Sequence, residues 1–286
     1  MTQSNLKPLE KRVAVVTGAS RGIGRAIAQR LASAGATVVI AARSVERSAD
    51  GLAGTLDETA DLIVTAGGKA IQIACDVESF ESRAQLVAEV ISKAGRVDIL
   101  VNNAGRAILD TIDSFTAETA LSQTEQYLIG PFDLTRLVLP HMRRQGAGWI
   151  VNLGSSSAIA PEGPPFDDNA THGGAVLYAA LKAAVHRMTV GLAAELFLDN
   201  ISANTVSPVG AILTPGVGAL GVIQPGMEAY VEPVEHIAEA TLALVEPEPR
   251  LLTGQTAFSY LYLDQIGRST RSLDGTNILH SRSRPE

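Results

Sequence analysis

The stretch Thr17-Gly18-Ala19-Ser20-Arg21-Gly22-Ile23-Gly24 joins a β-branched run to a segment whose apolar residues recur at helical spacing. Gly18 permits a sharp turn, and Gly22 and Gly24 allow a bound group and the following helix to approach the backbone closely. A helix that begins here directs free N–H groups and a partial positive charge toward an anion. The stretch therefore predicts a strand–turn–helix unit that holds the pyrophosphate of a dinucleotide, although a glycine-rich turn without a ligand has the same composition.

Short apolar runs alternate with amphipathic segments along the rest of the chain, and this alternation predicts the fold. Seven runs are predicted strands: 12–17, 37–42, 69–75, 97–101, 149–153, 201–206 and 255–260. The segments between them are predicted to contain helices at 23–31, 59–66, 86–91, 119–144, 177–198 and 234–245. Strands separated by helices imply parallel pairing, with crossover helices on both faces of one sheet. We predict an α/β fold, a single Rossmann-type doubly wound parallel sheet.

No linker or internal repeat interrupts this alternation, so a single domain is expected over residues 1–286. It would carry a polar N-terminal arm at 1–11 and a C-terminal tail at 268–286, which we interpret as solvated or as a subunit contact. In open parallel sheets, ligands bind beyond the carboxyl ends of the strands. Two irregular stretches, 158–175 and 208–233, directly follow predicted strands and should overhang that edge.

The composition narrows the classes of partner. A formal net charge of −7 argues against binding to nucleic acid, which requires clustered Lys and Arg. The N-terminal residues lack the apolar core of a signal peptide, and no apolar run approaches the length of a membrane span. The one cysteine, Cys75, excludes an intramolecular disulfide and lies in an apolar run, where strand packing is favoured over a nucleophilic role. We expect a cytoplasmic protein that has no metal site and binds neither nucleic acid nor membrane.

The residues after the second predicted strand bear on which dinucleotide binds. A site for NAD has an acidic residue there, which accepts a hydrogen bond from the ribose 2′-hydroxyl. This chain has Ala41-Ala42-Arg43-Ser44 instead. Arg43 could pair with the 2′-phosphate of NADP, and Arg21 could contact the same phosphate from the glycine turn. Both could also be surface arginines, but the missing acid and the two bases favour NADP (NADPH).

Four features, taken together and in this order, resemble the short-chain dehydrogenase/reductase family from about Lys11 to Gly267. They are the glycine turn, Asn102-Asn103-Ala104-Gly105 after the fourth strand, a serine after the fifth strand, and Tyr178-Ala179-Ala180-Leu181-Lys182. Ser207-Pro208 with Thr214-Pro215 is a fifth, weaker match. The resemblance implies an oxidoreductase that transfers a hydride between NADP(H) and a carbonyl or alcohol carbon of a small molecule.

Tyr178 and Lys182 are four residues apart on a predicted helix, so both side chains lie on one face. A free tyrosine titrates near ~10, but a nearby lysine ammonium and an oxidised nicotinamide both favour its phenolate. Tyr178 could then exchange a proton with the reacting oxygen as a general acid or base. A helix tyrosine with a surface lysine is the alternative, and the accompanying motifs favour catalysis.

The resemblance also implies a substrate-orienting serine after the fifth strand. The family pattern of strand, Asn, apolar, small and Ser matches Ser155, with Ser156 as the fallback and Ser157 assigned to the loop. Two histidines, His172 and His186, have no matched partners, and we interpret them as loop and helix-surface residues.

Residues that contact the cofactor are implied in the same way. Asp76 and Val77 are expected at the adenine ring, Lys182 at the nicotinamide ribose, and Thr214 with the backbone near Ile212 at the carboxamide. The full set of predicted cofactor contacts is Gly18, Ser20, Arg21, Gly22, Ile23, Gly24, Arg43, Ser44, Asp76, Val77, Asn103, Ala104, Gly105, Tyr178, Lys182, Pro208, Ile212 and Thr214.

The chain departs from the family pattern at four places. Tyr127 takes the position of an asparagine that usually supports a water chain behind the lysine, so either its hydroxyl replaces that group or the relay is absent. The segment 44–57 is longer than usual, and one residue is inserted in 207–210. The loop 158–175 is also extended, and we interpret it as a lid that shapes the pocket with Phe166, or else as a solvated excursion.

Substrate and assembly are only broadly indicated. The irregular stretches are apolar with scattered acids, which favours a neutral, mainly hydrophobic carbonyl or alcohol. A non-catalytic or regulatory NADP-binding protein is the main alternative, because a fold does not determine a function. Another hydride enzyme, such as an enoyl reductase or an epimerase, is a third. The resemblance also implies a homotetramer or homodimer formed through the long helices at 119–144 and 177–198.

Overall fold

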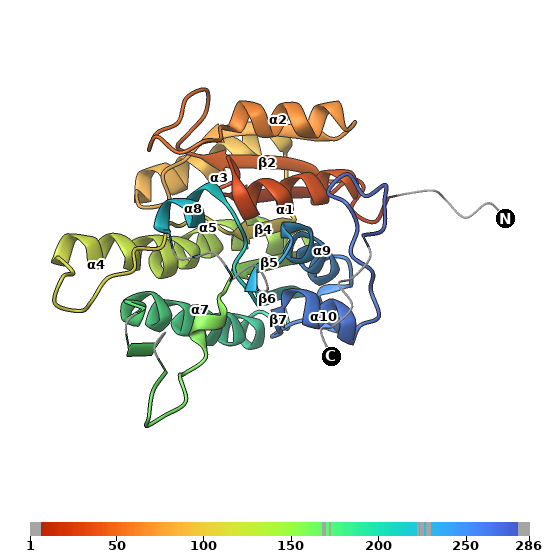
Figure 1. Cartoon of the computed structure of the whole chain (residues 1–286). Coiled ribbons are helices and arrows are strands. Elements are labelled where there is room, and N and C mark those ends of the chain that lie inside the picture. Colours follow the sequence, from red (N-terminus) through yellow and green to blue (C-terminus); the bar gives the residue numbers. More distant parts are fainter. Residues whose placement is uncertain are drawn as a thin grey trace.

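The computed structural model describes residues 7–167, 170–171, 173–221, 223, 226 and 230–279. One seven-stranded sheet runs through it, every strand pair is parallel, and the order is β3-β2-β1-β4-β5-β6-β7 (Figure 1). The strands are β1 (Val13–Thr17), β2 (Thr37–Ala42), β3 (Lys69–Ala74), β4 (Ile99–Asn102), β5 (Gly148–Leu153), β6 (Ile201–Ser207) and β7 (Thr256–Phe258). The central strands are buried along their whole length, because helices cover both faces of the sheet. The predicted doubly wound α/β fold is confirmed.

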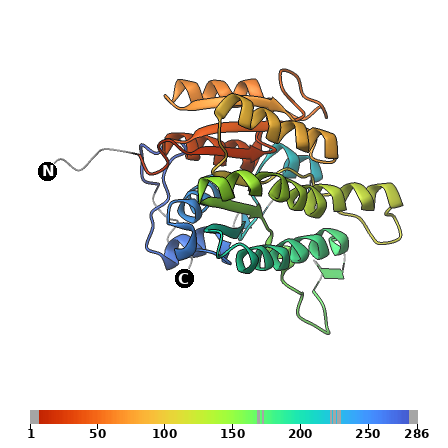
Figure 2. The same ribbon diagram turned by 180° about the vertical axis from the view of Figure 1, so that it is seen from behind.

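Two apolar cores fix the helices to the sheet, one on each face. The longer helices are α1 (Gly22–Ser33), α2 (Leu56–Thr65), α3 (Phe80–Ala94), α4 (Ala117–Thr124), α5 (Gly130–Gln145), α7 (Val176–Glu195), α9 (Val234–Val245) and α10 (Ser259–Gln265). Apolar residues of α1, α2, α9 and α10 fill one core, and those of α3, α5 and α7 fill the other (Figures 1 and 2). The strand order reverses between β1 and β4, so the loops at the carboxyl edge diverge there and leave room for a ligand.

The long helix predicted at 119–144 contains an irregularity. The structure begins it at Ala117 and ends it at Gln145, with a π-helical turn at Glu125–Ile129 that separates α4 from α5. Such turns insert one residue into the helical ladder and often occur at functional sites. Tyr127, which the sequence resemblance aligns with an asparagine, lies in the middle of this turn.

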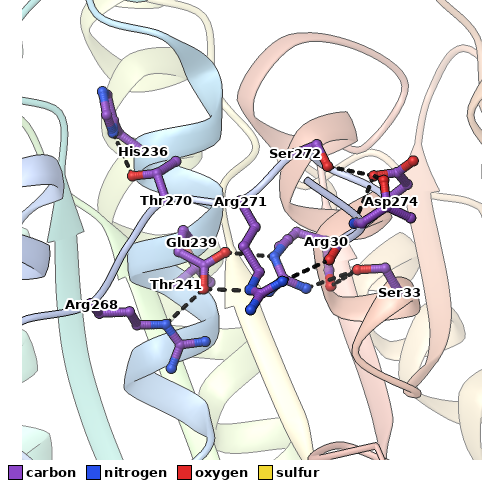
Figure 3. Close-up of polar contacts among 12 residues, drawn as sticks. Arg30, Ser33, His236, Glu239, Thr241, Arg268, Thr270, Arg271, Ser272 and Asp274 are labelled. Atoms are coloured by element: carbon purple, nitrogen blue, oxygen red, sulfur yellow. Dashed lines mark hydrogen bonds and ion pairs between the residues drawn. The ribbon is translucent and has the colours of Figure 1, made fainter. Parts of the chain in front are cut away.

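The C-terminal part of the chain differs from the prediction. The last strand is shorter than 255–260, because the chain turns into α10 at Ser259. The described part of the predicted tail is anchored rather than solvated, since Arg268 pairs with Glu239 and Glu246 of the α9 region. Thr270 is buried and its hydroxyl bonds to His236 (Figure 3).

The described part of the N-terminal arm also packs against the domain, with Leu9 fully buried beside α1. Cys75 is buried in the second core, as its apolar surroundings predicted. Within the described ranges, no helix combines the length and the apolar character that a membrane crossing requires.

A buried ion cluster connects the segment that follows α10 to the first helix, α1. Glu239 on α9 is 1% exposed and accepts hydrogen bonds from Arg30 Nε and Arg268 Nε, both at 2.6 Å (Figure 3). Since Arg30 is buried as well, its guanidinium depends on this carboxylate to compensate its charge.

Replacing Glu239 by Ala should therefore lower the free energy of unfolding by about 3–5 kcal/mol, because it leaves the buried Arg30 guanidinium without a counter-charge. Glu89→Ala is the control, since Glu89 pairs with Lys93 on the surface and should lose less than about 1 kcal/mol. Urea denaturation of both variants measures the difference, and equal losses would show that the Glu239 cluster contributes no more than a surface pair.

Candidate active site

A cleft with a volume of about 290 Å³ opens at the carboxyl edge of the sheet, at the reversal of strand order. All the predicted cofactor contacts except Ile212 line this cleft. Ile212 is buried behind it, and Ser155 is also absent from the lining although its neighbour Gly154 is present. Residues from the ends of six strands, separated widely in the chain, therefore meet in one place.

The glycine turn forms one end of the cleft. Gly18 and Gly22 have φ angles of +67° and +54°, which side chains rarely adopt. A Cβ atom at Gly24 would collide with the Gly18 carbonyl oxygen, so the first turn of α1 can sit against the strand only without a side chain. No side chain caps α1 and its first turn has no acidic residue, so its N-terminal N–H groups remain available to an anion.

Asn103 holds this turn in place. Its side-chain amide donates to the carbonyl oxygens of Thr17 at 2.8 Å and Gly18 at 3.2 Å. In return, the Thr17 hydroxyl accepts from the backbone N–H groups of Asn103 and Ala104. Asn103 lines the cleft as predicted, and it also fastens the ends of β1 and β4 to each other.

The opposite end of the cleft contains Tyr178 and Lys182. The Lys182 ammonium is 4% exposed and donates to the Leu153 carbonyl oxygen at 2.7 Å. Burial lowers the pKa of Lys182 to about 7. Burial raises the pKa of Tyr178, and a hydrogen bond with Ser155 opposes that rise. The Lys182 ammonium bonds to the end of β5 and lies 5.7 Å from the Tyr178 ring centre.

Ser155 is held by the short helical turn that follows β5. Its hydroxyl oxygen accepts from the Ser157 hydroxyl at 2.8 Å and from the Ser157 backbone N–H at 3.2 Å. Ser156 is exposed, whereas Ser155 is buried and its hydrogen bond with Tyr178 opposes the rise that burial causes in the pKa of that tyrosine. Ser157, which was assigned to the loop from the sequence, therefore fixes the position of the Ser155 hydroxyl through these two hydrogen bonds.

Tyr127, which the resemblance aligns with an asparagine of the family, brings an aromatic ring to the side of Tyr178 and Lys182. The ring is 6% exposed, meets Tyr178 edge-on at 5.4 Å between centres, and has the Lys182 ammonium 4.4 Å above its own centre. Gly105 leaves space for it, because a Cβ there would collide with the ring. Burial raises the pKa of Tyr127 well above its ordinary value. A ring face, rather than a polar group, therefore meets the lysine.

His186 is not the surface residue that we expected. It follows Lys182 by one helical turn, is half-buried, and lies 3.2 Å from the Ser207 hydroxyl through Nε2. A Cβ at Gly154 would collide with this nitrogen, and the ring edge contacts Phe258. Burial lowers the pKa of His186, and the nearby Lys182 charge lowers it further. His172 lies outside the described residues.

The two irregular loops take different paths. The described part of the 158–175 loop extends away from the body beyond α7, and none of its described residues lines the cleft (Figures 1 and 2). Phe166 is exposed and contacts Gly163 of its own loop. In the other loop, Thr214 caps α8 (Pro215–Leu220), and residues of that short helix line the cleft.

Glu232 anchors the loop that leads to α8, and it was not predicted from the sequence. Its carboxylate accepts from the Ser259 hydroxyl at 2.8 Å, and the Ser259 oxygen in turn accepts from the backbone N–H of Val209 at 3.3 Å, within the predicted insertion. Burial raises the pKa of Glu232 to about 7, and the hydrogen bond from Ser259 opposes the rise. The Glu–Pro pair before α9 was the available signal.

Acidic residues are also present where the sequence suggested only arginines. Asp50, from the long segment after β2, contacts Arg21 at 2.9 Å, and Glu78 lies 3.8 Å from Arg43. All of these residues line the cleft beside the glycine turn. The unusual length of the segment 44–57 was predicted from the sequence, but its contact with the cleft was not.

The lowered pKa of Lys182 predicts how the free energy of unfolding depends on pH. Between about pH 7 and pH 10.5 the unfolded chain retains a proton on this lysine that the folded chain has lost. The free energy of unfolding of the native protein should therefore rise relative to that of Lys182→Met as pH increases through this range.

Urea denaturation of both proteins near neutral pH and at alkaline pH measures this change. Lys93→Met is the control, because Lys93 is exposed on α3 and its replacement should leave the pH dependence as it is. A Lys182→Met difference that is the same at both pH values would contradict the lowered pKa.

Comparison with known proteins agrees with this arrangement. The family model described as short chain dehydrogenase matches residues 12–221. The chain is 32% identical over 263 residues to short-chain reductase protein NovJ of Streptomyces niveus, covering 86% of this chain and 92% of that protein. It is 33% identical over 264 residues to the 7alpha-hydroxysteroid dehydrogenase of Escherichia coli K12, covering 89% and 95%.

The crystal structure of a 3-oxoacyl (acyl-carrier-protein) reductase from Agrobacterium tumefaciens C58, with NADP bound, superposes with a TM-score of 0.75. That protein is 28% identical, and the match covers 90% of this chain and 96% of that one. The fold, the family model and relatives that match over most of their length agree: this chain belongs to the short-chain dehydrogenase/reductase family of oxidoreductases.

Proposed function

We propose that this protein is an NADP(H)-dependent oxidoreductase that interconverts a carbonyl and an alcohol, with Tyr178 as its acid and base. The observation that carries the proposal is one cleft with the uncapped N-terminus of α1 at one end and Tyr178 with Lys182 at the other, where Ser155 lies next to the lining residue Gly154. NADPH, when bound, supplies the hydride, and the oxidised cofactor accepts it in the reverse direction.

The cofactor fits the groups available in the cleft. The glycine turn offers backbone N–H groups and close approach to a pyrophosphate, and the side chains at the ends of β3 and β4 offer surfaces for adenosine and ribose. Arg21 and Arg43 provide two guanidinium groups beside this end, which supports NADP over NAD. The relative with NADP bound has the same fold over most of its length.

Tyr178 is suited to give a proton to the carbonyl oxygen of the substrate. Because burial raises its pKa, its hydroxyl is protonated at neutral pH and available as an acid. We assign Ser155 to orient the same oxygen, since its hydroxyl bonds to Tyr178 and is fixed by Ser157. In this scheme the buried Lys182 stabilises negative charge that develops on the Tyr178 oxygen when the proton leaves.

The substrate is proposed to be small and mainly hydrophobic. Ala107, Leu153, Val217 and Leu220 contribute apolar surface to the cleft, and α8 lies above it. Related proteins include a hydroxysteroid dehydrogenase and a 3-oxoacyl reductase, whose substrates by name carry an alcohol or a ketone beside extended hydrocarbon. We further propose that copies of the chain associate through the long helices at 119–144 (α4 to α5) and 177–198 (α7 and the residues that follow it), as the family resemblance implied.

Tyr178→Phe should remove the proton transfer and keep cofactor binding. Turnover of NADPH with a panel of ketones and aldehydes should fall by at least ~10²–10⁴-fold, the usual contribution of a general acid or base. The dissociation constant for NADPH, from fluorescence titration, should stay close to the native value. Tyr260→Phe on α10 is the matched control and should retain full turnover, because Tyr260 lies outside the cleft.

Native-level turnover by Tyr178→Phe would contradict the assignment of the acid. If the native protein binds NADPH but turns over no member of a broad panel of ketones, aldehydes and enones, the regulatory alternative would be favoured instead.

Tyr127→Phe tests whether the Tyr127 hydroxyl replaces the missing asparagine. The ring face, which Phe preserves, is the part of Tyr127 that meets Lys182. Turnover and its pH profile should therefore show no change that approaches the ~10²-fold loss expected on removing a proton-transfer group. A loss of that size, or a displaced pH profile, would assign the hydroxyl to the relay.

A further inference from the structure

The long segment between β2 and α2 folds back over the adenosine end of the cleft and brings an acid to it. Asp50 Oδ1 accepts a hydrogen bond from Arg21 Nη1 at 2.9 Å, and both side chains line the cleft. Their exposed fractions are 24% and 15%, so this contact is partly withdrawn from water. An ion pair of this kind is stronger than one on an open surface.

Asp50 is held in this position by its own loop. Its Oδ1 also accepts from the Leu52 backbone N–H and the Ser48 hydroxyl, both at 3.2 Å. The Ser48 hydroxyl also bonds to the Leu52 carbonyl oxygen, at 2.7 Å. Desolvation raises the pKa of Asp50, but the bonds from Arg21, Leu52 and Ser48 outweigh it and lower the pKa overall. The group is therefore an anion at neutral pH.

Arg21 is fixed from its other side as well. Nη2 bonds to the Ser44 hydroxyl at 3.2 Å and approaches the Gly54 carbonyl oxygen at 3.5 Å. The Ser44 oxygen also accepts from the Ala49 backbone N–H, so the loop and the guanidinium hold each other. The second arginine, Arg43, is half-exposed and has Glu78 3.8 Å away. Both arginines that line this end of the cleft therefore face a carboxylate.

We infer that Asp50 is a specificity-determining residue that occupies Arg21 as an internal counter-anion, so that a ribose 2′-phosphate must compete with it for the guanidinium. A phosphate is a better partner for a guanidinium than a single carboxylate oxygen, but its charge is repelled by an aspartate that remains nearby. Asp50 therefore reduces the preference for 2′-phosphorylated nucleotides that Arg21 and Arg43 would otherwise create. The inference rests on the proposed dinucleotide site.

The test uses two nucleotide fragments that differ at the ribose 2′ position. Isothermal titration of the full chain with 2′,5′-ADP and with 5′-AMP compares native protein, Asp50→Asn and the control Glu46→Gln. Glu46 lies in the same segment but outside the cleft lining, so its variant removes the same charge from the loop without touching Arg21. Asp50→Asn keeps an oxygen that can accept from Leu52 and Ser48.

Asp50→Asn should bind 2′,5′-ADP about tenfold or more tightly, because one negative charge beside the 2′-phosphate is removed. Binding of 5′-AMP should stay close to native, and Glu46→Gln should change neither constant appreciably. The gain should shrink as salt is added. It should also be smaller in Arg21→Gln/Asp50→Asn relative to Arg21→Gln alone, since only the direct repulsion between Asp50 and the phosphate is then relieved and no guanidinium is released.

An unchanged ratio of the two dissociation constants in Asp50→Asn, and also in Asp50→Ala, would overturn the inference and leave Asp50 as a loop residue. Weaker 5′-AMP binding by folded Asp50→Asn would overturn it differently, because Asp50 would then accept from the ribose 2′-hydroxyl. If native protein binds neither fragment nor NADPH, the proposed function itself fails, and the inference with it. Thermal unfolding of each variant verifies that it is folded.

Discussion

The bonds from the Asn103 amide to the carbonyl oxygens of Thr17 and Gly18 are the constraint on which the cleft depends. They join the end of β4 to the glycine turn at the point where the strand order reverses. Thr17 completes the connection through its own hydroxyl. With the turn fixed, the N-terminus of α1 faces the cleft, and side chains from neighbouring strand ends reach the same space. A single hydrogen bond of this kind adds little to the free energy of folding. Its main effect is to fix positions, because each of these bonds orders both the glycine turn and the loop after β4.

A second constraint governs the reacting end of the cleft, where a cation is buried. Lys182 loses its contacts with water on folding. A hydrogen bond to the Leu153 carbonyl oxygen and a contact with the face of the Tyr127 ring compensate part of that loss. The ring fits because Gly105 has no side chain and because the π-helical turn displaces the helix at that level. Gly105 and the π-helical turn, on two different elements, thus both make room for Tyr127. An aromatic ring lies behind the lysine, and Ser155 bonds to Tyr178.

The three segments that are longer than the family pattern differ in whether they contribute to the cleft. The segment after β2 returns to the cleft and carries an acid to Arg21, so it bears on the chemistry of binding. The loop after β6 places α8 over the cleft and is held from beneath by Glu232. The loop that follows Ser155 extends beyond α7 in its described part and does not line the cleft. Length alone therefore does not identify which loop acts on a ligand; the anchoring hydrogen bonds of each loop do.

The parallel fold, the glycine turn and the placement of Tyr178 and Lys182 one turn apart on the same helix were determined by the sequence alone, because each depends on periodicity or on spacings within one element. The cleft lining was also largely predictable, since parallel strands deliver their ends to one edge. Side-chain contacts between different elements could not be predicted from the sequence. Asp50 reaches Arg21 across 29 residues and His186 reaches Ser207 across 21, and neither pair has a local pattern. Only the tertiary structure decided these contacts, because loop paths and helix rotations are set by packing and hydrogen bonding between segments distant in the chain.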